Sequence, residues 1–170
     1  TAMLVITGGM VYMSFMPAKS NQLKLVWSDE FDYTGLPDNN KWNYDTGGGG
    51  WGNNELQFYT KSRKENARVE GGHLIIEAHK EKWENRDYTS ARLITKGKGD
   101  WKYGRIEVKA RIPSGLGTWP AIWMLGSNTP LKWPDDGELD IMEHVGYDQG
   151  KVHASVHCKK YNHVIGTQKT

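Results

Sequence analysis

The chain has 170 residues, the length of a single domain, and its 22 basic and 20 acidic side chains give a formal net charge of +2, so nothing points to nucleic acid or to a strongly acidic partner. Its one cysteine, Cys158, excludes an internal disulfide bond and lies on a strand-like pattern typical of an inert thiol. Eight tryptophans and eight tyrosines suit sugar binding, although a β-sandwich core uses aromatic residues too.

The first segment, residues 1–20, differs in composition from the rest of the chain. Residues 2–16 are apolar and uncharged, too few for a comfortable transmembrane helix but enough for the apolar region of a secretory signal. Ala18 and Ser20 supply small residues at a cleavage site. We therefore expect a signal peptide-like segment at 1–20 and a secreted, periplasmic or cell-surface protein without membrane attachment after its removal. A buried first strand or helix is the alternative.

From residue 23 onward the chain has the periodicity of strands. The runs at 23–31 and 73–80 are short and apolar, and the run at 103–113 alternates apolar and charged residues. Turn signals separate these runs, and no segment keeps a convincing helical period. The pattern predicts an all-β domain, a sandwich of antiparallel sheets. Leu74, Ile76 and Ala78 are expected to share one strand face, and the side chains expected to face the core are Ile106, Val108, Ala110 and Ile112.

The stretch "DGELDIMEH" at 136–144 places acids among residues that prefer a buried strand. Glu138 and Asp140 share one face, because strand side chains alternate with period two, and the leucine and isoleucine that follow them take the core face. Strict alternation would put Glu143 on the core face, which is costly for a charge. We therefore predict a β-bulge at Met142–Glu143 that returns Glu143 to the acidic face.

The neighbouring strands carry side chains that suit a sugar-binding cleft. Trp119 and Trp123 are four residues apart and share a face on a strand, and His153, Ser155 and His157 share a face on the next. Two carboxylates that flank a bond are also what glycoside hydrolysis requires. A solvated strand face is the simpler explanation of an E-x-D pair, and these neighbours argue against it.

Two further motifs indicate neither a phosphate-binding loop nor a metal site. The glycine run at 47–54 lacks the G-K-[ST] ending of a phosphate loop and does not lead from a strand into a helix. His153 and His157 would share a face of a helix, but the flanking residues predict a strand. Metal binding by this pair is therefore not expected.

Together these motifs resemble glycoside hydrolase family 16. The stretch "DGELDIMEH" looks like the family's E-x-D-x-x-E signature in its bulged form, and the resemblance covers about residues 24–160. Within the family it is similar to the bacterial laminarinases, which are endo-1,3-β-glucanases. The resemblance implies a concanavalin A-like β-jelly roll with a concave active-site cleft. The other runs that carry it are "LVWSDEFD", "WGNNELQFYT", "YTSARLITKGKGDWKYGRIEVKARIPSGLGTWPAIWML" and "WPDDGELDIMEH".

The resemblance implies a role for each acid. Glu138 matches the nucleophile that forms a glycosyl-enzyme, Glu143 matches the general acid/base, and Asp140 lies between them and tunes their charge. Three adjacent acids cannot all ionise easily, so one should keep its proton and serve as the acid. A retaining mechanism needs the two carboxyls about 5–5.5 Å apart. Five strand residues span roughly 16 Å, so the bulge and the two long side chains must close the difference.

The resemblance also implies sugar-binding residues. Asn53, Glu55 and Arg92 match positions that bond hydroxyls on the non-reducing side, and a structural ion pair is an equal alternative for Arg92. Trp119 and Trp123 match cleft walls, with ordinary packing as the alternative for Trp123. The remaining candidates are Trp51 and Trp133 on loops and His157 near the scission point.

Many members of the family hold a structural calcium ion away from the cleft, and catalysis needs no cofactor. Glu30 and the backbone of Gly72 match part of that calcium site. The family's domain normally runs well beyond the last residues here, so 21–170 is interpreted as its N-terminal portion, with an incomplete sandwich. We expect this portion alone to be poorly folded and inactive, and the protein to be a monomer.

The predicted function is hydrolysis of β-1,3-linked or mixed β-1,3/1,4-linked glucan with retention of configuration. A non-catalytic glucan-recognition module would be expected to lose the acids, and this chain keeps all three. A galactan hydrolase of the agarase or carrageenase type shares the bulged spacing, so only "WGNNELQFYT" and "GTWPAIWML" favour glucan. The transglycosylase type resembles E-x-D-x-E and is disfavoured.

Overall fold

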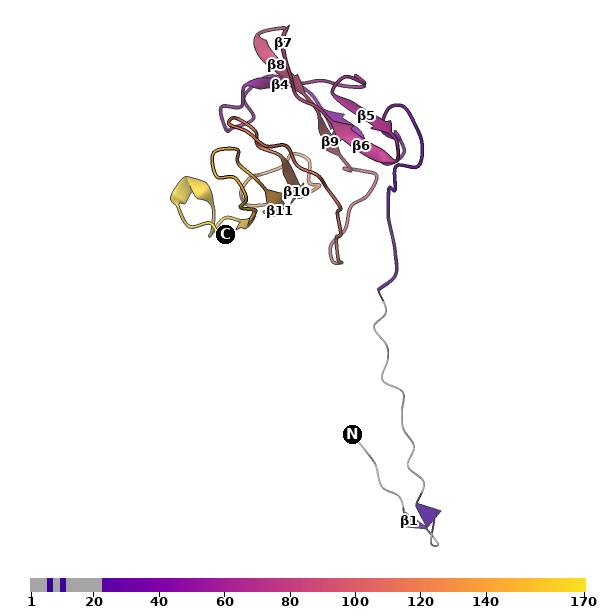
Figure 1. Ribbon diagram of the computed structural model, residues 1–170. Helices are drawn as coiled ribbons and strands as arrows, with labels where there is room; N and C mark the ends of the chain where they lie inside the picture. Colours follow the sequence, from indigo (N-terminus) through magenta and orange to yellow (C-terminus); the bar gives the residue numbers. More distant parts are fainter. Residues whose placement is uncertain (1–5, 8–9, 12–22) are drawn as a thin grey trace.

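The computed structural model describes residues 6–7, 10–11 and 23–170 as short strands joined by loops (Figure 1). Within this described part the one helical element is a 3₁₀ turn, η1 (His163–Ile165), and no helix could cross a membrane. The all-β prediction is confirmed. The strands are β1 (Ile6–Thr7), β2 (Met10–Val11), β3 (Asn43–Asp45), β4 (Gln57–Tyr59), β5 (Ala67–Glu70), β6 (His73–Ile76), β7 (His79–Trp83), β8 (Arg86–Ser90), β9 (Arg92–Ile94), β10 (Ala121–Leu125), β11 (Glu138–Glu143) and β12 (His153–His157).

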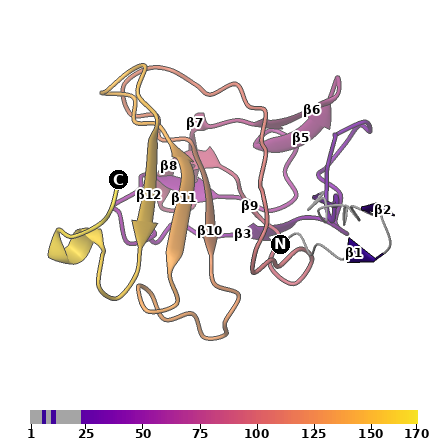
Figure 2. The same cartoon turned by 90° about the horizontal axis from the view of Figure 1, so that it is seen from below.

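The strands pair in five small sheets. β10, β11 and β12 form one sheet with β11 at its centre, and β4, β8 and β7 form a second three-stranded sheet. β3 pairs with β9, β5 with β6, and β1 with β2. Figure 2 shows β12, β11 and β10 side by side, with β9 and β3 beyond β10. The β4–β8 pair is parallel, whereas the sequence predicted antiparallel sheets throughout.

The predicted signal segment lies mostly outside the described residues. Within it the structure describes the pairing of β1 with β2. The prediction of a secretory signal at 1–20 is therefore not tested by the structure.

No strand forms over residues 23–31, contrary to the sequence prediction. Asp29 organises this segment instead, because its carboxylate accepts the Trp42 indole N–H at 2.7 Å and the Tyr33 hydroxyl at 3.2 Å. Lys41 Nζ lies 3.2 Å from the same carboxylate. Burial would raise the pKa of Asp29, but the bonds from Trp42 and Lys41 outweigh it and lower that pKa. Side-chain bonding thus replaces a backbone ladder here.

The predicted strand at 73–80 is two strands, β6 and β7. β5 and β6 form a hairpin whose turn residues, Gly71 and Gly72, have φ of 59° and 78°, the backbone of a type I′ turn. The chain leaves this hairpin at Glu77, whose N–H bonds the carbonyl of Asn66. Ile76, at the end of β6, is 51% exposed.

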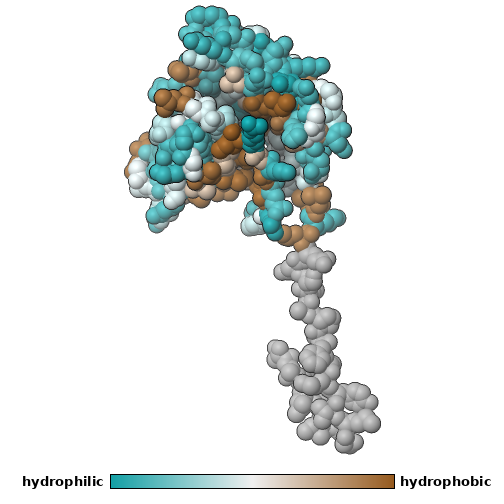
Figure 3. All heavy atoms as spheres, in the orientation of Figure 1, coloured by the Kyte–Doolittle hydropathy of each residue, from teal (hydrophilic) through white to brown (hydrophobic). Residues whose placement is uncertain are grey.

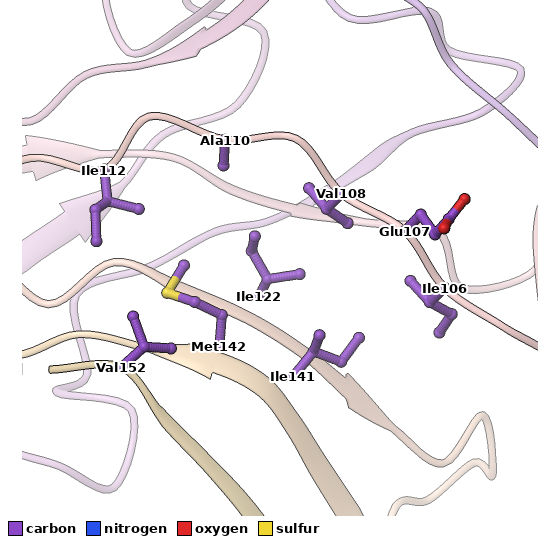
Figure 4. Close-up of a pocket in the computed structure, with 9 residues that line it drawn as sticks. All are labelled: Ile106, Glu107, Val108, Ala110, Ile112, Ile122, Ile141, Met142 and Val152. Atoms are coloured by element: carbon purple, nitrogen blue, oxygen red, sulfur yellow. The ribbon is translucent and has the colours of Figure 1, made fainter.

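The segment 103–113 is not paired as a strand, although its alternation predicted one. Its apolar side chains still point to one side, into an open groove of about 610 Å³ that they share with β10 and β11 (Figure 4). Ile106 and Val108 are 44% and 55% exposed, so they line a surface groove and not a closed core.

On β11 and β12 the polar face is buried and the apolar face is exposed. Asp140 and Ser155 are 5% and 7% exposed, whereas Leu139 and Val156 are 48% and 44% exposed. The predicted alternation is correct, but the expected core on the apolar side is wrong, because these side chains are half-exposed and Ile141 and Met142 line the open groove. Figure 3 shows apolar surface, in brown, across the middle and lower part of the described molecule.

A buried polar network around Asn66 connects β5, β7 and β8. Asn66 is fully buried, and its side-chain oxygen accepts from the Thr60 hydroxyl at 2.8 Å and from Arg63 Nη1 at 2.9 Å. Its amide nitrogen donates to Thr89 Oγ1 at 2.9 Å and to the Glu77 carbonyl at 3.0 Å. A buried amide with all these partners stabilises one arrangement of the strands. The apolar residues buried in the described part are Ala67, Val69 and Ala91.

Candidate active site

Three carboxylates lie on one face of β11, between β10 and β12. Glu138 and Asp140 alternate as their spacing predicted, and Asp140 is paired with Trp123 of β10 and Ser155 of β12. Glu143 is close enough to Asp140 for its charge to act on that carboxyl, as does the charge of Glu138. The central strand therefore brings the three predicted acids together.

A β-bulge in β11 returns the third acid to this face. Asp140 pairs with Trp123 and Met142 pairs with Ile122, which leaves Ile141 without a partner on β10. The extra residue thus lies one position earlier than the sequence predicted. The predicted effect is still present, because one added residue restores the alternation after the bulge.

Trp133 holds the first glutamate. Its indole N–H donates to Glu138 Oε2 at 2.5 Å. The loop that carries Trp133 is closed by Asp136, whose carboxylate accepts the backbone N–H of Lys132 at 2.6 Å and the side-chain amide of Asn128 at 2.8 Å. The bond from Lys132, followed by that from Asn128, lowers the pKa of Asp136 and keeps it an acceptor.

Trp119 holds the second glutamate. It lies just before β10, and its indole N–H donates to Glu143 Oε1 at 3.0 Å. The turn before Trp119 is tied to the loop after Glu143, because the Gly146 N–H bonds the Thr118 carbonyl at 2.8 Å. A Cβ on Gly146 would lie 1.7 Å from the Gly115 carbonyl oxygen, so only glycine permits this approach.

Asp140 is the buried member of the three acids. Its Oδ2 lies 3.2 Å from His157 Nε2, and the two side chains are 3% and 8% exposed. Burial, then the charges of Glu138 and Glu143, raise the pKa of Asp140 to about 7. Asp140 therefore retains a proton to near neutral pH, while each glutamate accepts an indole N–H. The acid with the raised pKa is thus Asp140, whereas the sequence assigned the role of proton donor to Glu143.

Arg92 lies between two of the predicted cleft tryptophans. Its guanidinium carbon lies 4.6 Å from the Trp51 ring centroid and 4.5 Å from that of Trp123. Arg92 Nε lies 2.9 Å from Asp45 Oδ2 but does not direct its hydrogen at it, so this contact is an ion pair. The ion pair that the sequence left open is present, together with a stack that joins β9 to β10. The sugar-binding role of Arg92 stays a prediction.

Glu55 lies next to this stack through Tyr59. Its Oε2 accepts the Tyr59 hydroxyl at 2.9 Å and Gln57 Nε2 at 2.5 Å, and the Tyr59 ring lies 5.5 Å from that of Trp51. Burial, then the charge of Glu55, raises the pKa of Tyr59 above its usual range. Asn53 lies exposed on the turn between Trp51 and Glu55, where its backbone N–H donates to the Gly50 carbonyl.

The predicted calcium site has few ligands in this structure. Glu30 is exposed and Gly72 lies in the β5–β6 turn, and these two would supply a minority of the six to eight oxygens that calcium requires. In the described part, Glu138, Asp140 and His157 each offer a ligand atom within 4.8 Å of the others. Within this cluster Glu138 accepts the Trp133 indole N–H, and Asp140 Oδ2 lies 3.2 Å from His157 Nε2 without a hydrogen bond.

The sequence analysis did not predict that His163 lies near the acids. The His163 ring lies 4.9 Å from Trp133 and 5.3 Å from His157, between centroids. Asn162 before His163 and Gly166 after it are cap residues, a signal that could have predicted a helical turn. No signal in the sequence shows that this turn folds back onto Trp133.

The apolar groove is separate from this site. It is lined by Ile141 and Met142 of β11 and by the 103–113 segment, and none of the three acids lines it (Figure 4). The polar face of β11 is therefore the candidate active site.

Comparisons with known proteins agree with this geometry. A family model described as "XgeA-like, catalytic GH16 domain" matches residues 52–170. A beta-glucanase from Rhodothermus marinus is 62% identical over 154 residues, which are 89% of this chain and 54% of that protein. The chain therefore spans about half the length of that relative.

Solved structures show the same similarity. The laminarinase from Rhodothermus marinus superposes with a TM-score of 0.85 at 62% identity, over 87% of this chain and 60% of that one. SCLam, a non-specific endo-β-1,3(4)-glucanase from family GH16, superposes with a TM-score of 0.82 at 50% identity, over 86% of this chain and 57% of that one. These superpositions confirm the predicted β-jelly-roll fold class.

Proposed function

The chain belongs to glycoside hydrolase family 16, and from this premise we propose that the protein is a retaining endo-hydrolase of β-1,3-linked glucan that also accepts mixed β-1,3/1,4-linked glucan. The observation that carries the proposal is one strand face with three acids, on which each glutamate has its own indole donor. The similarity to a laminarinase and to a non-specific endo-β-1,3(4)-glucanase supports the substrate class.

The proposed reaction has two displacements. The Glu138 carboxylate attacks the anomeric carbon while Glu143 gives its proton to the leaving glycosidic oxygen, so the C–O bond breaks and a glycosyl ester forms. Glu143, now a carboxylate, then takes a proton from a water whose oxygen attacks the same carbon and releases Glu138. Two inversions leave the product in the β configuration.

Asp140 keeps the charge of the site low in this proposal. Its raised pKa means that Asp140 stays protonated to near neutral pH, so it does not add a negative charge beside the nucleophile. The facing His157 belongs to the same buried polar pair and orients Asp140. Asp140 itself makes and breaks no bond with the sugar.

Aromatic and polar side chains around the acids form the proposed glucan-binding surface. Trp119 is 48% exposed beside Glu143, which suits stacking on a sugar face. Arg92 connects two of the tryptophans and suits hydroxyl binding through its remaining N–H groups. The residues proposed to contact glucan are Trp51, Asn53, Glu55, Arg92, Trp119, Trp123, Trp133 and His157.

A secreted, monomeric protein is part of the proposal. The support for secretion is the apolar, uncharged run at 2–16 followed by small residues. N-terminal sequencing of secreted material should find a mature chain that begins near residue 21. A mature chain that begins at Thr1 would contradict the proposed secretion. The same material can be assayed for bound calcium, which the proposal assigns to Glu30 and Gly72.

Reducing-sugar release by the full-length protein tests the function. We expect release from laminarin and lichenan and none from agarose, and Glu138→Ala should abolish it. Release from agarose alone would identify a galactan hydrolase. Binding to laminarin with no hydrolysis would identify a glucan-recognition module instead.

A further inference from the structure

The ring of His163, which lies outside the predicted site, packs against both Trp133 and His157, the neighbours of two of the acids. The exposed His163 ring lies 4.9 Å from the Trp133 ring, tilted by 35°, and 5.3 Å from the His157 ring, nearly perpendicular to it at 79°. Trp133 and His157 are themselves 6.2 Å apart. These separations are those of favourable aromatic pairs. The three side chains therefore form one ring cluster, with His163 on its outer side.

The loop that carries His163 is built to hold it there. Asn162, 3% exposed, caps η1 by accepting the Ile165 N–H, and its amide donates to the carbonyl of Cys158. The chain then returns to β12, because the Val156 N–H bonds the Lys169 carbonyl at 2.9 Å. Figure 2 shows this turn, in yellow, beside β12. A buried cap and a backbone bond thus fix an exposed ring.

The other two rings of the cluster, Trp133 and His157, each contact a different acid. Trp133 donates to Glu138 Oε2 at 2.5 Å, and His157 Nε2 lies 3.2 Å from Asp140 Oδ2. Glu143 is held by Trp119, which comes from another loop and, within the described part of the chain, pairs with no ring of the cluster. Movement of His163 therefore bears on two of the three acids and leaves the third in place.

We propose that His163 is a positioning residue for the glucan hydrolysis proposed above, on which this inference rests. Its ring holds the Trp133 indole against Glu138 and the His157 imidazole against Asp140. It touches neither acid and takes no part in bond making. Its effect is on the orientation of the nucleophile and of the nucleophile's neighbour.

Loss of the ring should have an asymmetric effect on the pH profile. The Trp133 indole N–H donates to the Glu138 carboxyl, so loss of this hydrogen bond should move the acidic limb of kcat/KM to higher pH. Among the described residues, Asp140 and His157 each bring a titratable atom within 4.8 Å of Glu138, and His157 belongs to the ring cluster. The basic limb should move less, because Glu143 is held by Trp119, which the His163 ring does not contact.

The test compares four variants of the full-length protein on laminarin. His163→Ala should lower kcat/KM by roughly 10- to 100-fold, mostly through kcat, because displaced reacting groups lose rate more than binding. The acidic limb of its kcat/KM profile should move to higher pH by about one pH unit. His163→Phe keeps the ring and should restore most of the activity. Trp133→Phe should reproduce the acidic shift, and adding His163→Ala to it should cost less than the product of the two single effects.

Val164→Ala is the matched control, since Val164 lies next to His163 on η1 and is 71% exposed. It should leave both limbs unchanged. The inference is overturned if His163→Ala matches the wild type, if His163→Phe is as impaired as His163→Ala, or if both limbs move together. A wild-type protein that does not hydrolyse laminarin would instead refute the proposed function, a result distinct from these.

Discussion

Each acid of the site has a distinct set of partners. Glu138 and Glu143 accept one indole N–H each, while Asp140 is buried against His157. Because burial and two neighbouring charges oppose its ionisation, Asp140 is the group whose protonation should couple most strongly to folding. The spacing E-x-D predicts a shared face, but it cannot predict which acid becomes buried, since that depends on loops far along the chain.

The raised pKa of Asp140 predicts a pH-dependent effect of Asp140→Asn on stability. The pKa is about 7 in the folded protein against a usual 3.8, so the carboxyl stabilises the fold fully below pH 3.8 and this contribution is lost as the pH rises to about 7. The amide of the variant stays neutral. Its Tm, relative to that of the wild type, should therefore rise between these two pH values and level off above the higher one.

Thermal melts of the full-length protein across this range provide the measurement. Asp100→Asn is the control, because Asp100 is exposed and its variant should show no comparable rise. A Tm difference for Asp140→Asn that is flat with pH would mean that Asp140 ionises as an ordinary surface carboxyl does.

Short loops between the strands determine how the glutamates are held. The turn before β10 carries Trp119 and meets the loop after β11 at Gly146, where the backbones approach too closely for any side chain. The loop before β11 carries Trp133, and η1 supports it. The sheet therefore aligns the acids, and the loops supply their donors.

Gly146→Ala should separate these two loops and release Trp119 from Glu143. The new methyl group would overlap the Gly115 carbonyl, so we expect a loss of stability of about 1–3 kcal/mol and a marked fall in kcat on laminarin. Chemical denaturation and steady-state kinetics measure the two effects.

Gly49→Ala is the matched control, since a Cβ there meets no atom within 4 Å and the backbone is not left-handed. It should change stability by less than about 1 kcal/mol. Wild-type stability and kcat in Gly146→Ala would show that this close approach is not required.

The sequence predicted the catalytic strand better than the rest of the fold. Alternation at Glu138 and Asp140 and the need for a bulge before Glu143 follow from local chain geometry, and the structure has both, with the bulge one residue earlier. The run at 23–31 looked like a strand by composition, yet Asp29 bonds it to side chains instead. The 103–113 alternation is real, but pairing requires a partner strand that periodicity cannot supply.

Across the whole molecule the two faces of the β10–β12 sheet differ in how they are covered. The polar face is packed under Trp133, His157 and the loops, while the apolar face opens into the groove with Ile141 36% exposed. Burial of apolar area is the main source of folding stability, so the area left exposed on this open face does not contribute to that stability.

We expect the 170-residue chain on its own to bind anilinonaphthalene sulfonate strongly and to melt over a broad range. The groove residues would supply the dye-binding surface, and Ile141→Lys should weaken the dye fluorescence. A sharp cooperative transition, no dye binding and full activity on laminarin would contradict this expectation.

The two roles given to Glu138 and Glu143 are the centre of the account, and azide rescue tests them most directly. The substrate is an aryl β-laminaribioside, whose good leaving group needs little acid help. With Glu138→Ala, azide should replace the nucleophile in a single displacement and give the α-glycosyl azide. With Glu143→Ala, azide should attack the intermediate on Glu138 and give the β-glycosyl azide. Proton NMR of the products of the full-length variants distinguishes the anomers: these two products are the predicted result, and the reversed pair would contradict the assignment.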